Sequence, residues 1–325
     1  MLLDSYGREI NYVRLAVTDR CNLRCVYCMP AKGLNWINRK DLLSLEETTR
    51  LLNILATLGI RKVRFTGGEP FLRKDFMDIL RATASLNSFE TITLTTNGTL
   101  THPHISEMKA LGVSSVNLSA DTFNTERFFK MTRRNDLDAV IKTFHSLLDH
   151  GIKTKINAVV MENKNEEDII ELSKLAQQYP VDIRFIEEMP FNGDGKSHAA
   201  KWNFIAITDH LKAHYPEMHR LPFVKSATSY DYEIPGFLGK VGVIAAYSRT
   251  FCGTCNRIRI TPQGHLKTCL YDDASTHLIP LLRSNSSDSK IADIIRESIA
   301  KKPVDGHEAE RMRNPVNESM ATIGG

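Results

Sequence analysis

The alternation of short strand-like and helical segments over residues 12–186 limits most strongly what this chain can fold into. Six segments are rich in β-branched and apolar residues and have the length of strands. They span residues 12–18, 62–66, 91–95, 114–119, 153–160 and 181–186. Helices are expected between them, at about 44–58, from 75, at 103–111, 124–131 and 136–149, and after the fifth strand at 165–178. Short parallel strands that alternate with helices predict an α/β sheet or barrel.

The alternation ends after Met189. Residues 190–235 are predicted to be irregular, apart from one helix near 208–215. Beyond them we expect a hairpin-like group of strands at about 240–247, 256–261 and 265–270. Two helices are expected after these strands, at about 276–283 and 287–301. The polar tail ends in Gly324-Gly325, and its composition alone predicts a disordered end.

All six cysteines fall into two groups of three, which are Cys21, Cys25, Cys28 and Cys252, Cys255, Cys269. Six cysteines in a small secreted domain would suggest three disulfides, but this chain has 325 residues. The spacing C-x3-C-x2-C lets three thiolates from one loop bind one metal centre. A closed zinc site and a simple [4Fe–4S] carrier each use four protein ligands, so three thiolates on a cubane leave one iron open. Zinc with a distant fourth ligand and plain core cysteines remain alternatives, and His265 is the candidate fourth ligand for the second group.

Charge and hydropathy narrow the class of protein further. The formal net charge of +4 permits an anionic small substrate but is far below that of a typical nucleic-acid-binding domain. The start of the chain lacks a signal-peptide pattern, and no apolar run reaches transmembrane length. We therefore expect a cytoplasmic protein that binds neither nucleic acid nor membrane.

Candidate ligand-binding residues follow the predicted strands. The first cysteine loop follows strand one, Gly67-Gly-Glu-Pro70 follows strand two, and Thr95, Ser119 and Met189 lie at or after the ends of later strands. Sites in parallel sheets and barrels lie at the carboxyl ends of strands, so these residues are predicted to converge. The paired glycines let backbone approach a ligand closely, although an ordinary turn is the alternative.

Cations lie inside segments that are normally apolar. Arg14, Arg64 and Lys155 each fall within a predicted strand, and Arg257 and Arg259 alternate along a strand beside the second cysteine group. Parallel strands are usually buried on both faces, so such cations indicate an interior that binds an anion such as phosphate. Exposure at strand ends is the alternative for any one of them.

The motifs together resemble a known family. Cys21-x3-Cys25-x2-Cys28 with Tyr27, followed by Gly-Gly-Glu-Pro, is similar to the signature of the radical S-adenosylmethionine (SAM) superfamily. The set Arg64-Phe-Thr-Gly-Gly-Glu-Pro70, Lys155-Ile-Asn-Ala-Val-Val160, Phe251-Cys-x2-Cys-Asn-Arg-x-Arg259 and the terminal Gly-Gly resembles the GTP 3′,8-cyclase (MoaA) family of molybdenum cofactor biosynthesis. The resemblance covers residues from near Gly7 to Gly325.

The resemblance implies an incomplete (β/α)6 TIM-type barrel over residues 1–189, with an α+β segment at 190–325 that closes its mouth. It also implies two [4Fe–4S] clusters, held by the two cysteine groups. SAM would bind the open iron of the first and contact Tyr27, Gly68, Ser119 and Met189. GTP would bind the open iron of the second cluster and contact Arg14, Arg64, Thr95, Lys155, Arg257, Ile258 and Arg259. The implied catalytic residues are Cys21, Cys25, Cys28, Arg257 and Arg259.

The family's chemistry implies further partners and features. They are an electron donor such as flavodoxin or ferredoxin, a downstream cyclic pyranopterin monophosphate synthase, a homodimer, and a diglycine tail that reaches toward the active site. Ala120, Glu188 and residues 190–235 depart from the family pattern, which puts loop geometry in doubt. A peptide-modifying radical SAM maturase and a zinc-stabilised binding protein without enzymatic activity are the rival interpretations.

Overall fold

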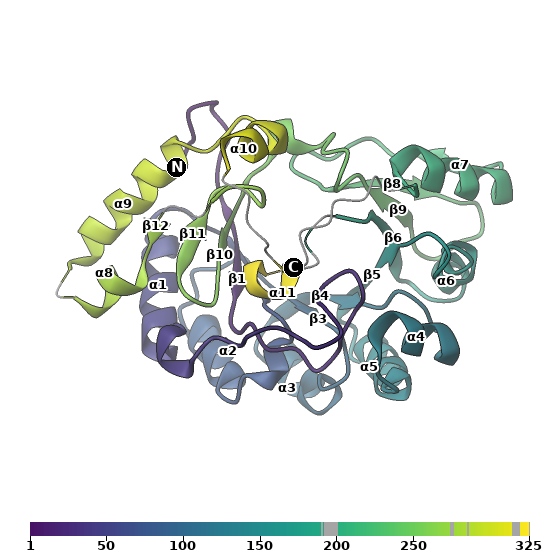
Figure 1. Cartoon of the computed structure of the whole chain (residues 1–325), viewed down its shortest axis with the longest axis horizontal. Coiled ribbons are helices and arrows are strands. Elements are labelled where there is room, and N and C mark those ends of the chain that lie inside the picture. Colours follow the sequence, from purple (N-terminus) through teal and green to yellow (C-terminus); the bar gives the residue numbers. More distant parts are fainter. Residues whose placement is uncertain (190, 192–200, 274–275, 285, 314–318, 325) are drawn as a thin grey trace.

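The structure of the chain is a computed structural model that describes residues 1–189, 191, 201–273, 276–284, 286–313 and 319–324. Its described strands form one twelve-stranded sheet in the order β12-β11-β10-β1-β2-β3-β4-β5-β6-β9-β8-β7. Figure 1 shows this sheet curving around the short C-terminal helix α11 (Met320–Ile323). No helix in these ranges combines the length and the apolar character that crossing a bilayer requires.

The six central strands run parallel and lie side by side in chain order. They are β1 (Tyr12–Ala16), β2 (Lys62–Thr66), β3 (Thr91–Thr96), β4 (Val113–Ser119), β5 (Lys153–Val160) and β6 (Asp182–Glu187). The predicted α/β sheet with parallel strands is confirmed. In β5, Thr154, Ile156, Ala158 and Val160 are buried while the alternate residues are half-buried or exposed, so one face of the strand packs in the core and the other does not.

Helices cover the outer face of the curved sheet (Figure 1). They are α1 (Leu45–Thr57), α2 (Phe76–Ser85), α3 (Ile105–Ala110), α4 (Thr125–Thr132), α5 (Leu137–Asp149) and α6 (Asp168–Gln178), with short 3-10 turns η1 (Arg39–Asp41), η2 (Pro70–Leu72) and η3 (His102–His104). Ser44 begins α1 with a capping box, because its hydroxyl accepts from Glu47 N while Ser44 N donates to Glu47. Apolar residues of the strands and helices form two large buried clusters, whose members include Phe65 and Phe185.

The C-terminal part extends both edges of the six-stranded region. β9 (Val241–Ile244) is parallel to β6 and carries β8 (Ser229–Glu233) and β7 (His219–Arg220) in antiparallel pairing. β10 (Arg257–Ile260) is parallel to β1 and carries β11 (His265–Lys267) and β12 (Thr276–His277). The predicted grouping of three C-terminal strands is therefore wrong in part. Of the three predicted strands, β10 and β11 pair with each other, whereas β9 adds to the opposite free edge at β6.

The remaining helices are α7 (Phe204–His214), α8 (Ile279–Arg283), α9 (Asp288–Ala300), α10 (Gly306–Met312) and α11, with a 3-10 turn η4 (Cys252–Thr254). The prediction of one helix near 208–215 is confirmed by α7, but the prediction that the rest of residues 190–235 is irregular is wrong in part, since β7 and β8 also lie there. Residue 190 and residues 192–200 lie outside the described residues. The expectation of a disordered tail is also wrong for residues 319–324, which form α11 and its cap.

Candidate active site

The first cysteine loop follows β1 and is supported by the end of α4. Arg24 N donates to Thr132 O and Val26 N donates to Met131 O, each at 2.9 Å, so the last carbonyls of α4 hold the loop backbone. Within the loop, Cys28 N donates to Cys25 O at 3.0 Å. Burial raises the pKa of all three thiols in the metal-free chain, to about 11 for Cys21 and about 12 for Cys28.

The paired glycines bring a second loop against the first. A Cβ on Gly67 would lie 2.4 Å from Thr18 O, and one on Gly68 would lie 2.2 Å from Arg20 O. Gly68 N donates to Thr18 O at 2.8 Å, so this N–H binds the cysteine loop. The sequence predicts that the backbone at these glycines approaches a ligand closely. In the structure, the same backbone packs against the cysteine loop and leaves no room for a side chain at either position.

Two buried carboxylates behind these loops were not predicted as functional residues. Glu69 accepts from Asn97 N at 2.7 Å and from Thr96 Oγ1 at 2.8 Å. Asp121 accepts from the Tyr27 hydroxyl at 3.0 Å and from Val159 N. Burial raises the pKa of each carboxyl to about 7, although the hydrogen bonds oppose the shift. For Asp121 the only signal in the sequence is its position just after the fourth strand.

One cavity of about 590 Å³ brings the predicted site residues together. Both cysteine groups line it, as do all the predicted SAM contacts. The predicted GTP contacts that line it are Arg14, Arg64, Thr95, Lys155, Arg257 and Arg259. Ile258 does not line it, because its side chain is fully buried in the core on the other face of β10. The residues that follow the predicted strands therefore lie together around this cavity, as the sequence predicts.

The register of the sheet places the cations in rows. Arg14 is the direct neighbour of Arg64 on one side and of Arg259 on the other. Lys62 and Arg184 also line the cavity but were not predicted as site residues. The two-residue period of a strand could have identified Lys62, because it lies on the same face of β2 as Arg64. Seven positive side chains from β1, β2, β5, β6 and β10 therefore face one space, namely Arg14, Lys62, Arg64, Lys155, Arg184, Arg257 and Arg259.

Burial and mutual repulsion both act on these cations. Burial, followed by the charge of Arg259, lowers the pKa of Arg14 well below its ordinary value. Burial and then the charge of Arg184 lower the pKa of Lys155 to about 8, against the effect of Asp182, whose Oδ2 lies 3.0 Å from Lys155 Nζ. Burial of the Tyr12 phenol opposes its ionisation, yet Arg64, Arg14 and Lys62 together lower its pKa to about 8.

Several buried polar atoms of the cavity residues have no hydrogen-bond partner among the described residues. They are Arg14 Nε, Asn117 Oδ1, Asn157 Oδ1, Arg184 Nε, Arg249 Nε and Asn256 Oδ1. Native interiors satisfy nearly all such groups, so a set of them in one cavity indicates a site for a polar ligand. Together with the cations, they fit a ligand that carries several negative charges and hydrogen-bonding groups.

The second cysteine group lies at the start of β10 and just after β11. Cys255 N donates to Cys252 O at 3.0 Å, and Arg257 Nε lies 3.4 Å from Cys255 Sγ. Burial opposes ionisation of Cys255, but Arg257 and Lys302 outweigh it and lower the pKa of this thiol to about 6. His265 does not line the cavity, and its ring stacks on His277 with 4.2 Å between centroids. Its candidacy as a fourth zinc ligand gains no support.

The donor set of each group fits an iron–sulfur cluster. In the part of the chain that the structure describes, no three His, Cys, Asp or Glu side chains are gathered to hold one metal ion. The thiolates of a cubane bind different iron atoms, so they need not meet at one point. Each group offers three cysteines to the shared cavity, and a cubane held by three thiolates keeps one iron free to face it.

The C-terminal tail enters the cavity region. Ser319 Oγ donates to Cys28 O at 2.6 Å, and Met320 and Ala321 line the cavity. Arg259 Nη1 donates to Gly324 O at 2.5 Å. Gly324 has φ +79°, and a Cβ there would lie 2.9 Å from Ala16 Cβ. The tail thus links the first cysteine loop to Arg259, while Gly325 lies outside the described residues.

Comparison with known proteins places this site in a family. Residues 15–176 match the Radical SAM superfamily, and residues 181–308 match Molybdenum Cofactor Synthesis C. GTP 3′,8-cyclase of Clostridium perfringens is 38% identical over 323 residues, which cover 99% of each chain. Molybdenum cofactor biosynthesis protein 1 of Bos taurus is 37% identical over 93% of this chain, which spans 48% of that protein.

A solved structure supports the fold. The structure of Streptococcus suis SuiB bound to S-adenosylmethionine superposes with a TM-score of 0.61 at 16% identity, covering 88% of this chain and 68% of that one. At this identity the likeness concerns the fold alone. The full-length similarity to the Clostridium enzyme is much closer, and it includes both cysteine-bearing regions. The chain therefore belongs to the GTP 3′,8-cyclase family, within the radical SAM superfamily.

Proposed function

We propose that this chain converts GTP to (8S)-3′,8-cyclo-7,8-dihydroguanosine 5′-triphosphate, the first step of molybdenum cofactor biosynthesis. One observation carries the proposal. Two groups of three cysteines and a set of strand-borne cations line one cavity of about 590 Å³. A cavity of this size is in the range of small-molecule sites, and its charge suits a triphosphate.

We assign Cys21, Cys25 and Cys28 to the first [4Fe–4S] cluster and Cys252, Cys255 and Cys269 to the second. When bound, the clusters would supply single electrons from an external reductant, and SAM would supply the 5′-deoxyadenosyl group that takes up the ribose 3′ hydrogen, which would allow the C3′–C8 bond to form. Tyr27, Gly68, Ser119 and Met189, which line the cavity, form the SAM site. Asp121 holds the Tyr27 hydroxyl and so fixes its orientation.

The nucleotide site is formed by Arg14, Arg64, Thr95, Lys155, Arg257 and Arg259 with the backbone at Ile258. Arg64 is already held by Tyr12 OH and Leu94 O, so its guanidinium is oriented before a ligand arrives. Arg14, whose buried Nε has no partner among the described residues, leaves a donor for the phosphates. The protein's part in the reaction is to bind and orient the two substrates and to keep water out. Arg257 and Arg259 act at the guanine end, beside the second cluster.

We further propose the finer architecture and the partners that the family suggests. Residues 1–189 form an incomplete (β/α)6 barrel, and residues 190–325 close its mouth and carry the second cluster. The contact of Ser319 with Cys28 supports a closing role for the tail. A cytoplasmic homodimer would take electrons from flavodoxin or ferredoxin and pass its product to cyclic pyranopterin monophosphate synthase.

The test is anaerobic turnover with GTP, SAM and a strong reductant. We expect brown protein with iron and sulfide for two cubanes, and formation of 5′-deoxyadenosine together with a cyclised guanine nucleotide. Colourless protein with stoichiometric zinc would contradict the proposal. SAM cleavage that does not respond to GTP would instead favour the peptide-modifying maturase.

A further inference from the structure

The N-terminal turn is built around a buried ion pair. Arg8 Nε lies 2.6 Å from Asp4 Oδ2, and the two residues are 8% and 6% exposed. Asp4 Oδ1 also accepts from Tyr6 N and Arg8 N, each at 2.9 Å, which closes the turn. The Ser5 hydroxyl donates to Ala300 O at the end of α9. Residues 4–8 are therefore a fixed support rather than a loose end.

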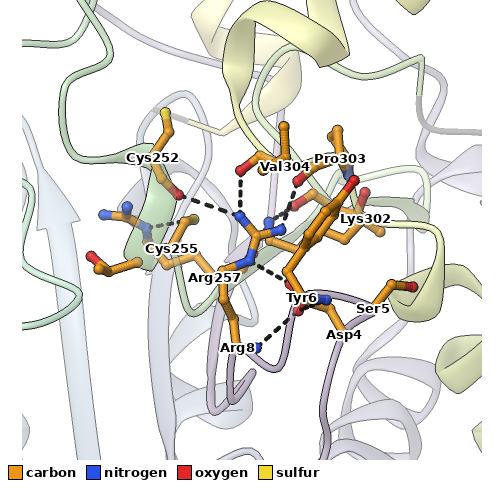
Figure 2. A network of polar contacts seen from close by, with 12 residues as sticks. Asp4, Ser5, Tyr6, Arg8, Cys252, Cys255, Arg257, Lys302, Pro303 and Val304 are labelled. Carbon is orange, nitrogen blue, oxygen red and sulfur yellow. Dashed lines mark hydrogen bonds and ion pairs between the residues drawn. The ribbon is translucent and has the colours of Figure 1, made fainter.

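From this support the Arg8 guanidinium reaches the second cysteine group. Nη2 donates to Pro303 O at 2.6 Å, and Nη1 donates to Val304 O at 2.5 Å and to Cys252 O at 3.4 Å. Figure 2 shows Arg8 pointing between the backbone of Cys252 and that of residues 303–304. One buried side chain thus joins the N-terminal turn, the segment after α9 and the first cysteine of the group.

Lys302 continues the same contacts toward the other two cysteines. Its ammonium donates to Arg257 O at 3.0 Å and to Thr268 O, and the residue is 3% exposed. Thr268 directly precedes Cys269, and Arg257 lies two residues after Cys255. Both acceptors are uncharged carbonyls, so they leave the positive charge of Lys302 beside the cysteines.

We propose that Arg8 and Lys302 are positioning residues for the second [4Fe–4S] cluster. Together they fasten residues 302–304 to all three cysteine-bearing segments and fix the distances between the thiolates. The inference rests on the proposed function, since it requires that Cys252, Cys255 and Cys269 hold a cluster. Neither side chain lines the cavity, so both act through the cysteine segments and not on GTP.

Two consequences distinguish the residues. Arg8 ties Cys252 to two other segments, so its loss lets the ligand geometry relax and weakens retention of the cluster. Lys302 adds a buried positive charge, which stabilises the reduced, more negative state of the cluster and raises its potential. Replacement of Lys302 by methionine keeps the length of the side chain and removes this charge.

Arg50 on α1 offers a control arginine, because its hydrogen bonds go to residues 282–288 and not to the cysteine-bearing segments. Its Nε lies 2.8 Å from Asp288 Oδ1, while Nη1 and Nη2 donate to Leu282 O and Ser286 O. This arginine makes the same kind of contacts as Arg8, namely one carboxylate and backbone carbonyls. The substitution Arg50→Met therefore reports the general cost of removing such an anchor.

The experiment uses the full chain with Cys21, Cys25 and Cys28 replaced by serine, so that only the second cluster is present. Arg8→Met, Lys302→Met and Arg50→Met are introduced, reconstituted anaerobically and checked for folding by circular dichroism. Iron content, the electron paramagnetic resonance spectrum of the reduced protein and its midpoint potential are measured. We expect Arg8→Met to lose most of the iron, Lys302→Met to keep the iron with a more negative potential, and Arg50→Met to match its parent.

Iron content, spectrum and potential equal to those of Arg50→Met in both variants would overturn the proposal. If Arg8→Met does not fold, Lys302→Met decides alone, and an unchanged potential overturns the proposal. A parent chain that binds no cluster at Cys252, Cys255 and Cys269 would contradict the proposed function instead.

Discussion

Arg14 shows how single residues create the site. It lies between Arg64 and Arg259 in the sheet, and its buried Nε has no partner among the described residues. Three adjacent guanidinium groups repel each other, and this repulsion destabilises the folded state when no anion is bound. Strained or under-satisfied groups of this kind concentrate at functional sites, where a ligand completes them.

Lys155 makes nucleotide affinity depend on pH. Burial and the charge of Arg184 lower the pKa of its ammonium to about 8, so a rising pH removes this positive charge from the empty site. Ionisation of Tyr12, with a pKa of about 8, acts in the same direction. We expect GTP affinity, measured by calorimetry, to fall between pH 7 and 9, and Lys155→Gln to bind about tenfold more weakly at pH 7 with a flatter profile. An unchanged profile in Lys155→Gln would show that another group titrates.

Glu69 makes stability depend on pH with the opposite sign to that of a typical carboxylate. Burial raises the pKa of this carboxyl from 4.5 to about 7, so the folded chain holds the proton more tightly than the unfolded chain. Its contribution is therefore greatest below pH 4.5 and is lost as pH rises to 7. In urea titrations of the metal-free chain, we expect Glu69→Gln to show a smaller decline in the free energy of unfolding, with the remainder due to Asp121, whose pKa burial also raises to about 7. A decline of the same size in the variant would assign it to other groups.

At the scale of elements, the tail and β10 depend on each other. Gly324 O accepts from Arg259 on β10, and the glycine packs directly against Ala16 at the end of β1. Helix α11 alone has only one turn and cannot be stable by itself. Its place therefore comes from these contacts and from Ser319 at the first cysteine loop.

A pair of glycine substitutions tests the tail. Gly324 and Gly112 both have positive φ, at +79° and +78°, but only Gly324 has atoms near its missing Cβ. Each alanine substitution strains the backbone by roughly 1 kcal/mol. We expect Gly324→Ala to lose GTP-dependent formation of 5′-deoxyadenosine and Gly112→Ala to retain it. Equal activity in the two variants would mean that the tail contact is dispensable.

The elements that the sequence predicts are those with strong local patterns. The six parallel strands and α1 with its capping box follow from β-branched runs and from Ser44 and Glu47. Strand β8, with the sequence Ser-Tyr-Asp-Tyr-Glu, has a polar composition, and only its pairing with β9 makes it a strand. Arg64 and Lys155 were identified by a period of two. Lys302 could not be identified from the sequence, because its role comes from contacts with Thr268 and Arg257, which lie 34 and 45 positions away.

At the scale of the whole molecule, the cavity concentrates positive charge from five strands. Cations from β1, β2, β5, β6 and β10 face it, while the chain carries a net charge of only +4. A polyanion that binds there relieves the repulsion in the folded state and has no such site in the unfolded chain. Ligands of this kind stabilise by mass action.

Thermal unfolding with matched ligands tests this view. We expect GTP and inorganic tripolyphosphate each to raise the melting temperature of the chain, and guanosine, which lacks phosphate, to raise it much less. At 100 times the dissociation constant the stabilisation is about 2.7 kcal/mol. High salt should reduce the effect of tripolyphosphate. Equal shifts with GTP and guanosine would show that the cations are not the main binding groups.

The order of strands also has a consequence for synthesis of the protein. β1 is covered by β10 and β6 by β9, so both edges of the six-stranded region stay open until residues 241–260 have left the ribosome. Open, apolar strand edges pair readily with other chains. We therefore expect the nascent polypeptide to be prone to aggregation until these strands have been made. A chain that terminates before residue 241 would keep both of these strand edges open and would also lack the second cysteine group.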